Sequence, residues 1–467
     1  MRRREEGWRT ARSLTLNGTA RPVTAGPQIA AGPAAAPATR AQLVALGEYV
    51  RHVASSFRNV EWSLSFIGVL LYIFVTTTYR LPVGDVAMAC ALFGLFLLRG
   101  QLRFPPAAIL YFAFLIWACV GLMLSPYPTV VVEEIWTGVK VGLILLAAVN
   151  ALRSRSQIRF FIVFFLACFG SHPARGTVIN YLTGNADFGR AAWNYIYENS
   201  NDMAALTLLQ LSMALGLIMT ERKGIIRLGA LFALGIFPVV ILMTQSRAVM
   251  LGLGVFTLLA IAGHKRKLRS LAVLGVVGAL TIAVAPKGVW ERMSGLANVT
   301  DTENLRAVDA EGSAEQRWMI WKAGVQIVNA NPVAGVGLGA YQYANGDVSA
   351  ILGKKDAHST YLTFAAENGY PGLILFLLLV GVTISRSRRV RKRCSVVLPS
   401  AAQQLRYLEI GLIAFLVAGI WGSYGKLAFL YVHIALIWAL AAAIEAEWKR
   451  TQLAAASGVA APLPQGA

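Results

Sequence analysis

Residues 106–124 read PAAILYFAFLIWACVGLML and contain no charged side chain. A helix needs about 20 mostly apolar residues to cross the hydrocarbon core of a bilayer. The whole chain has the same character, since 56% of its 467 residues are hydrophobic, only 14% are charged and the mean hydropathy is +0.57. A soluble domain of this length does not need so many apolar residues. The sequence therefore predicts an all-α polytopic membrane protein.

Other stretches of the chain meet the same criterion of length and composition. The best count is twelve spans, although ten to twelve are defensible because prolines blur several boundaries. The expected spans are 61–79, 82–98, 106–124, 133–152, 158–180, 202–220, 225–243, 247–263, 269–285, 366–385, 406–424 and 427–446. A long polar insert separates the ninth span from the tenth.

These spans divide the chain into five expected parts. They are a disordered cytoplasmic tail with an interfacial amphipathic helix (1–58), transmembrane helices 1–9 (59–285), a large periplasmic loop with amphipathic helices (286–365), transmembrane helices 10–12 (366–447) and a cytoplasmic tail (448–467).

The net charge of +20 fits this topology. Lysine and arginine favour cytoplasmic loops, and with a cytoplasmic N-terminus the clusters His264–Lys267 and Arg386–Arg393 both fall on the cytoplasmic side. The basic loops also suit anionic headgroups of membrane lipids. Nucleic-acid binding is the weaker explanation of the charge. We therefore expect both termini in the cytoplasm and no nucleic-acid partner.

Two arginines lie on the opposite side, each at a membrane boundary. Arg190 follows Gly189 before the sixth span, and Arg247 ends Thr244-Gln245-Ser246-Arg247 at the start of the eighth. A guanidinium costs about 2.5–3.5 kcal/mol at the centre of a span and less near its end, so such residues tend to face a polar cavity. The alternative is an arginine that snorkels to the headgroups. Their common side with the polar insert favours a shared polar site.

The polar insert contributes Arg317 at the start of an expected helix. The apolar residues predicted on one side of that helix are Trp318, Trp321, Val325 and Val328. This pattern predicts an amphipathic helix over the membrane surface, from which Arg317 can reach the site. A surface ion pair of Arg317 with Glu315 or Asp309 is the alternative.

His358 stands at the end of the insert, next to the tenth span. A neutral imidazole can take a proton from a hydroxyl group, and Asp356 or Glu367 is near enough in sequence to orient it. An ordinary surface histidine is the alternative. The other histidines, at positions 52, 172, 264 and 433, show no ligand spacing with His358, so no metal site is predicted.

Gly335-Val336-Gly337-Leu338-Gly339 matches part of a dinucleotide-binding fingerprint. No strand precedes it and no βαβ unit surrounds it, so the match is weak. A flexible loop with a close backbone approach is the better interpretation. No cofactor is predicted.

Several short motifs resemble the O-antigen ligase and O-antigen polymerase superfamily. They are Phe188-Gly189-Arg190 with Glu198-Asn199-Ser200-Asn201-Asp202, Thr244-Gln245-Ser246-Arg247-Ala248, Arg317 with Asn331–Gly339, and His358-Ser359-Thr360-Tyr361 with Glu367-Asn368-Gly369. The resemblance covers about residues 60–445 and does not distinguish members within the superfamily. Ala248 stands where the family usually has glycine, and Ser200 stands where it usually has proline.

The resemblance implies a GT-C-like fold in the bacterial inner membrane with a periplasmic active site. It implies a metal-independent inverting glycosyltransferase that takes a glycan from a polyprenyl diphosphate, usually undecaprenyl, to an acceptor hydroxyl. Arg190, Arg247 and Arg317 would bind the donor diphosphate, because guanidinium groups hold it bidentately. His358 would deprotonate the acceptor, with Asp356 and Glu367 in support.

Three activities share these motifs. A ligase of lipopolysaccharide biosynthesis, acting on lipid A–core, is the leading interpretation. A polymerase of O-antigen or exopolysaccharide repeat units, with a glycan acceptor, is the alternative, and a third kind modifies protein. A flippase for lipid-linked glycans is the alternative from another class. No repeat relates the two halves of the chain and the unusual charges lie at one surface, which favours an enzyme.

Overall fold

A computed structural model describes residues 57–78, 83–98, 101–186, 189–194, 197–262, 313–349 and 353–457. The chain clusters into two units, Met1–Ser55 and Ser56–Ala467, and all described residues belong to the second. The expected ninth span and almost all of the expected interfacial helix lie outside the described residues.

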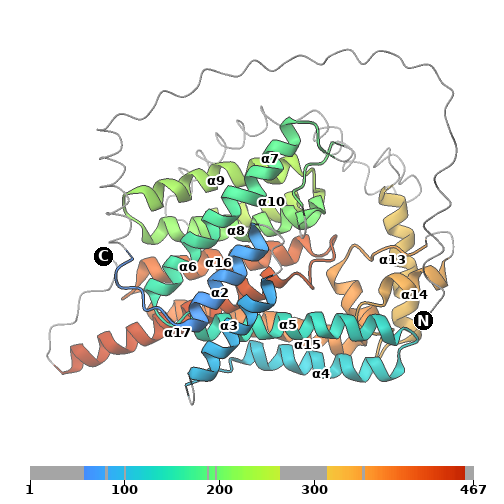
Figure 1. The fold of residues 1–467 in the computed structure, drawn as a ribbon, viewed down its shortest axis with the longest axis horizontal. Coiled ribbons are helices and arrows are strands. Elements are labelled where there is room, and N and C mark those ends of the chain that lie inside the picture. The colour runs from blue at the N-terminus through green and yellow to red at the C-terminus, as the bar shows by residue number, and fades with distance from the viewer. Residues whose placement is uncertain are drawn as a thin grey trace, which may run out of the picture. The chain divides into compact units, whose positions relative to one another are not determined.

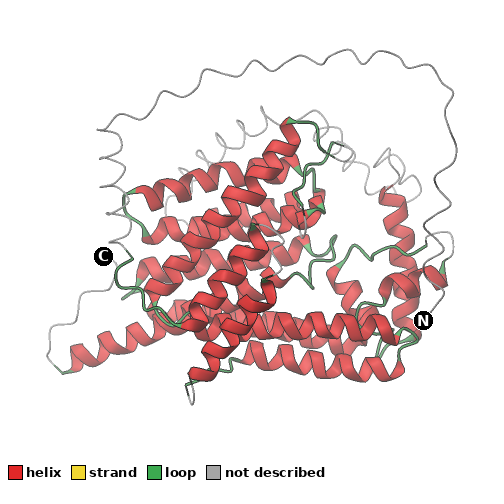
Figure 2. Ribbon diagram, in the orientation of Figure 1, coloured by secondary structure: helices red, strands yellow, loops and turns green. Residues whose placement is uncertain are grey.

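Helices make up nearly all of the regular structure in the described part of the chain (Figure 2). In order, they are α2 (Leu64–Thr77), α3 (Gly84–Leu97), α4 (Pro106–Leu124), α5 (Pro128–Ala151), α6 (Arg155–Phe169), the π-helical turn η1 (Gly170–Ala174), α7 (Arg175–Leu182), α8 (Ser200–Thr220), α9 (Ile225–Met243), α10 (Arg247–Ala262), α13 (Ser313–Ala330), α14 (Tyr341–Val348), α15 (Thr360–Cys394), α16 (Pro399–Ala418) and α17 (Ala428–Ala456).

Seven stretches of described helix are long and apolar enough to cross a membrane. They are α4, the continuous run Arg155–Leu182, α8, α9, α15, α16 and α17. The shorter apolar helices α2, α3 and α10 coincide with three further expected spans. The prediction of an all-α polytopic membrane protein is confirmed, whereas the total of twelve spans stays a prediction.

Local sequence signals explain where several helices begin. Ser63 caps α2 by accepting a hydrogen bond from the Phe66 amide at 3.2 Å. Ser154 and Gln157 form a reciprocal capping box at the start of α6. Proline occupies the first position of α4, α5 and α16, where its missing N–H has no helical partner to lose. These local signals explain why the helices begin at these residues.

Small residues allow helices of the bundle to approach one another closely. A Cβ atom built on Gly68 of α2 would lie 2.3 Å from the Ala91 amide nitrogen of α3, and one on Gly411 of α16 would lie 2.3 Å from Ser212 of α8. Such contacts drive helix association in membranes, where apolar burial alone gives little. Glycine at these positions therefore fixes the packing of α2 on α3 and of α8 on α16.

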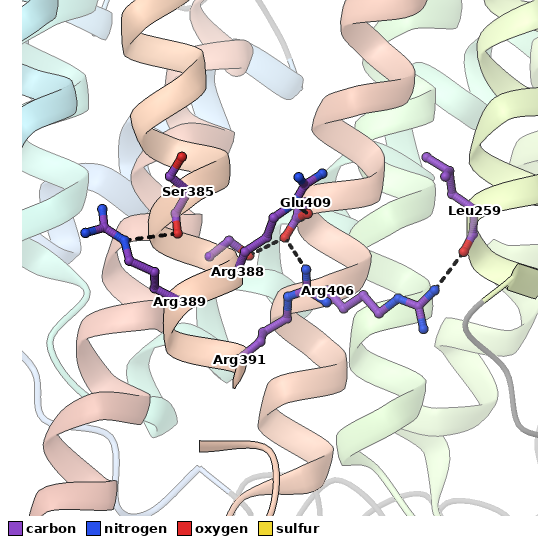
Figure 3. A network of polar contacts seen from close by, with 8 residues as sticks. Leu259, Ser385, Arg388, Arg389, Arg391, Arg406 and Glu409 are labelled. Atoms are coloured by element: carbon purple, nitrogen blue, oxygen red, sulfur yellow. Dashed lines mark hydrogen bonds and ion pairs between the residues drawn. The ribbon is translucent and has the colours of Figure 1, made fainter. Parts of the chain in front are cut away.

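Helix α15 connects the two ends of the bundle and is kinked at Gly369, which has φ 64°. It begins beside His358 and ends in the basic stretch Arg386–Arg393. At that basic end, Figure 3 shows Glu409 of α16 accepting from Arg388 Nε at 2.9 Å and from Arg391 Nη2 at 2.8 Å. The basic residues therefore lie at the far end of α15 from His358.

The described part of the polar insert packs on the other end of the bundle. Helices α13 and α14 lie beside the ends of α4, α5 and α15 (Figure 1). On α13, Trp318 and Val325 are exposed, whereas Ile320, Ile327 and Val328 are buried. The expected helix is present and packs on protein through Ile320, Ile327 and Val328, while Trp318 and Val325 of the predicted apolar face lie outward; contact of that face with the membrane stays a prediction.

Candidate functional site

Two loops that are far apart in the sequence lie side by side next to the start of α10. The Ala191 amide donates to the Met243 carbonyl at 3.0 Å, and Gln245 Nε2 donates to the Gly189 carbonyl at 2.8 Å. The segments that carry Arg190 and Arg247 are thus joined by hydrogen bonds.

Asn201, in the first turn of α8, connects these two loops. Its Oδ1 atom accepts from Arg190 Nη2 at 2.7 Å and from Ser246 Oγ at 2.8 Å. Arg190 Nε also donates to the Thr244 carbonyl at 3.2 Å. The guanidinium of Arg190 is therefore held in one orientation, and Ser246 places Arg247 directly after this junction.

Both asparagines of the motif Asn199-Ser200-Asn201 accept hydrogen bonds that fix the start of α8 or the adjoining loops. Asn199 is the N-cap of α8 and accepts from the Asn201 amide at 2.8 Å, while Asn201 makes the junction. Ser200, the position that departs from the family's usual proline, is the first residue of α8. Serine is compatible with a helix start, so this departure leaves both asparagines in place.

His358 adopts a left-handed backbone conformation, with φ 49°, and Gln245 has φ 52°. Among the described residues other than glycine, these two have positive φ. Such conformations cost on the order of 1–3 kcal/mol, persist only where the surroundings impose them, and cluster at functional sites. Both residues lie in the loops that carry the predicted site.

Contacts on either side of His358 impose its conformation. The carbonyl of Ala357 accepts from Trp321 Nε1 of α13 at 2.9 Å. The Thr360 amide donates to the Gly419 carbonyl at 2.8 Å and to the Gly422 carbonyl at 2.9 Å. Helix α13 and the loop between α16 and α17 therefore hold the backbone around His358 from two directions.

Arginine side chains from two elements act on the half-buried imidazole of His358. Burial lowers the pKa of His358, and the charges of Arg317, Lys355 and Arg190 lower it further, while Asp356 opposes them. The Asp356 carboxylate is held by the Ala357 amide, which donates to its Oδ1 atom at 2.9 Å. At neutral pH this histidine is therefore uncharged, which is the form that accepts a proton.

Tyr424, from the loop between α16 and α17, is a residue of this region that sequence reasoning missed. Its side chain is buried, and its charged neighbours include Asp202, Arg317 and Arg190. Burial, and then the negative charge of Asp202, raises the pKa of the Tyr424 hydroxyl. The phenol stays protonated and can donate a hydrogen bond. No motif in the sequence marks Tyr424, because its position depends on packing across the bundle.

Glu367 is not among the charges that act on His358, and it forms a buried ion pair. Its Oε2 atom lies 2.8 Å from Lys426 Nζ, and its side chain is 2% exposed. The neighbouring backbone interlocks with the glycine-rich loop, since the Gly337 amide donates to the Glu367 carbonyl at 2.9 Å and the Tyr370 amide donates to the Pro332 carbonyl at 2.9 Å.

The glycines of this region serve the close approach of two backbones. Gly335 has φ 69°, and a Cβ atom built on it would lie 2.3 Å from the carbonyl carbon of Glu367. A Cβ atom on Gly369 would lie 2.0 Å from the Val333 carbonyl oxygen. The glycine-rich stretch is therefore a packing element of the insert, which agrees with the close approach expected from the sequence.

A polar cavity of about 210 Å³ lies behind Asp356. Its lining residues are Glu134, Gln342, Asp356, Thr360, Thr363, Phe364, Ser423, Gly425 and Lys426. The described ranges contain no group of three or more His, Cys, Asp and Glu side chains placed to hold a metal ion.

Of the six side chains selected from the sequence, Arg190, Arg317, Asp356 and His358 lie close enough to interact electrostatically. Arg247 follows the Ser246 junction, and Glu367 is paired with Lys426.

Comparison with known families adds an independent observation. Residues 228–377 match the family model described as O-antigen ligase, and no curated protein matches the chain. The matched segment runs from α9 into α15, so it includes Arg247, Arg317 and His358. Arg190 and Asn201 precede it. This stretch of the chain is therefore similar to the O-antigen ligase family, as its motifs led us to expect.

Proposed function

We propose that this protein is an inverting membrane glycosyltransferase that transfers a glycan from undecaprenyl diphosphate to a hydroxyl group of lipid A–core. The match of residues 228–377 to the O-antigen ligase family model supports the class of enzyme. The observation that carries the proposal is a half-buried histidine, His358, beside the cationic side chains of Arg317 and Arg190. This arrangement offers a proton acceptor next to a site for a polyanion.

The arginines bind the donor. Arg190, Arg247 and Arg317 hold the diphosphate through their guanidinium groups, which match phosphate oxygens bidentately. They stabilise the negative charge that grows on the diphosphate as its bond to the sugar breaks. Arg190 is already oriented by Asn201 and Thr244, so little reorganisation is needed when the donor arrives.

His358 acts on the acceptor. Its neutral imidazole takes the proton of the acceptor hydroxyl while that oxygen forms a bond to the anomeric carbon. The bond between this carbon and the diphosphate oxygen breaks, and the undecaprenyl diphosphate leaves with the electron pair. Attack from the face opposite the leaving group inverts the anomeric configuration. Asp356 stabilises the imidazolium that forms, and this sequence of steps requires no metal ion.

The orientation of the protein follows from its charge distribution. The arginines at the end of α15 lie far from His358, and lysine and arginine favour cytoplasmic loops. We therefore assign the basic end of α15 and both termini to the cytoplasm, and the site to the periplasmic face of the bacterial inner membrane.

The proposal is tested with purified protein, an undecaprenyl-diphosphate-linked repeat unit and mass analysis of the products. A ligase forms glycosylated lipid A–core only when lipid A–core is added. A polymer formed from the donor alone would identify a polymerase of O-antigen or exopolysaccharide. If the donor instead crossed sealed vesicles without any transfer, the protein would be a transporter.

The same assay tests the role of His358. We expect His358→Ala to abolish transfer while the protein binds undecaprenyl diphosphate as the wild type does, because the imidazole acts on the acceptor. Full activity of His358→Ala would refute its assignment as the base.

A further inference from the structure

The cavity lined by Asp356 has no role in the proposed binding of the donor or in the proposed proton transfer. It is bounded by α5, α14, the start of α15 and the loop between α16 and α17, which contribute Glu134, Gln342, Thr360 and Lys426 among its lining residues. Asp356 and Thr360 each stand two positions from His358 in the chain. His358 is not itself a lining residue, but the Asp356 carboxylate that lines the cavity also acts on its imidazole, so the cavity lies near the proposed base.

The size of the cavity suits one sugar ring. A single buried water needs only about 10–15 Å³ of space, whereas pockets for drug-sized ligands measure about 300–1,000 Å³. At about 210 Å³, this cavity is too large for one water and too small for an oligosaccharide chain. The lining is largely polar, and its one aromatic residue, Phe364, is buried against Phe114 and Phe376.

The charges of the cavity disfavour a diphosphate. Its lining includes the carboxylates of Glu134 and Asp356, and its cation, Lys426, is already paired with the buried Glu367. The carboxylates that act on the Lys426 ammonium are Glu367, Glu134 and Asp356. Carboxylates only accept hydrogen bonds when ionised, so they repel phosphate oxygens and accept readily from hydroxyl groups. Arg317 and Arg190, which suit the diphosphate, act instead on His358.

The remaining polar groups complete a set that matches a sugar. The amide of Gln342 can both donate and accept, and so can the hydroxyl of Ser423. Lys426 has three donor hydrogens and gives some of them to Glu367. A sugar ring offers several hydroxyls that donate and accept in the same way.

We propose that this cavity binds the acceptor, as a single sugar residue whose attacking hydroxyl points to His358, while the arginines bind the donor diphosphate on the other side. The inference rests on the proposed function, and it adds Glu134, Gln342 and Ser423 as residues that recognise the acceptor. His358 then stands between the two substrates, as proton transfer during direct displacement requires.

Two substitutions test the assignment. Gln342 is exposed, so Gln342→Ala removes its amide with little effect on packing. Glu134→Gln keeps the shape of the side chain and removes its charge. We expect each to raise the KM for the acceptor about threefold to tenfold, the effect of one lost hydrogen bond, while the Kd for undecaprenyl diphosphate stays unchanged. Gln403→Ala, the same change at an exposed position near the other end of α16, should alter neither constant.

The experiment separates failure of this inference from failure of the proposed function. Binding of lipid A–core and of the lipid-linked repeat unit is measured without turnover, on variants whose elution volume and Tm match the wild type. A wild type that transfers no glycan refutes the proposed function. The cavity assignment is refuted if both variants bind these two glycolipids as the wild type does, or if their Kd for undecaprenyl diphosphate rises instead.

Discussion

Replacing Asn201 with alanine removes the one oxygen that accepts hydrogen bonds from both Arg190 and Ser246. The bond from Arg190, at 2.7 Å, involves a charged donor, and such bonds contribute roughly 1.5–3 kcal/mol. Since about 1.4 kcal/mol corresponds to a factor of ten, the affinity for undecaprenyl diphosphate should fall roughly tenfold to a hundredfold. The loss reflects an Arg190 side chain that is no longer oriented toward the donor.

The same substitution also affects stability through Ser246, which is 1% exposed. Without Asn201 its hydroxyl loses this acceptor, and an unsatisfied buried group costs roughly 1–3 kcal/mol. Ser246→Ala on top of Asn201→Ala should therefore recover part of the lost stability, because it removes a buried hydroxyl that has lost its Asn201 acceptor.

The measurements are the Kd for undecaprenyl diphosphate and the midpoint of chemical unfolding in detergent. Ser246→Ala alone is the matched control, because it keeps the bond between Asn201 and Arg190 and should change the Kd less than threefold, roughly the value of a weak neutral hydrogen bond. The reasoning is wrong if Asn201→Ala binds the donor lipid as the wild type does, or if Ser246→Ala weakens binding equally.

Further predictions concern the charged groups. Arg247→Lys should abolish most transfer, because lysine is a point charge and cannot hold a diphosphate bidentately; retained activity would indicate a snorkelling side chain. Because the pKa of His358 is lowered, the transfer rate should fall only when the pH drops below 6.5. Asp356→Asn should move this fall to a still lower pH, since the Asp356 charge raises the pKa of His358. A fall in the rate that begins above pH 6.5 would contradict the base assignment. Lys426→Met should lower the free energy of unfolding, measured with a chemical denaturant, by roughly 3 kcal/mol. This value is near the lower limit for a broken buried pair, because Lys426 is 32% exposed. Adding Glu367→Gln should restore much of the lost stability, because it removes the unpaired buried carboxylate.

The sequence predicted helix boundaries well where a proline or a glycine stands at the start of an apolar run. The expected spans 106–124 and 225–243 have the bounds of α4 and α9, which begin at Pro106 and directly after Gly224. The tenth span was expected at 366–385, whereas α15 runs from Thr360 to Cys394. Hydropathy marks only the part of a helix that crosses the hydrocarbon, and the polar arginines beyond residue 385 continue the same helix into water.

The sequence drew attention to several charged residues of the candidate site but not to the contacts between them. Arg190 stood out because a charge at a membrane boundary is costly, whereas Arg317 and His358 stood out in the polar insert, and the structure brings these three together. The pairing of Glu367 with Lys426, which are 59 residues apart, depends on how α15 meets the loop before α17. The role of Asn201 as a double acceptor depends equally on long-range packing. Hydrophobic periodicity carries no information on either contact.

The left-handed conformation of His358 has a consequence for protein engineering. Glycine would adopt this conformation without the steric penalty of about 1–2 kcal/mol that a side chain carries, so His358→Gly relieves strain. A search for thermostable variants that rewards relaxed backbones would therefore favour the removal of the proposed base. Gln245 differs, because its side chain also donates to Gly189 and the gain would be offset. Selection for stability alone should thus favour glycine at position 358, whereas selection for turnover should favour histidine.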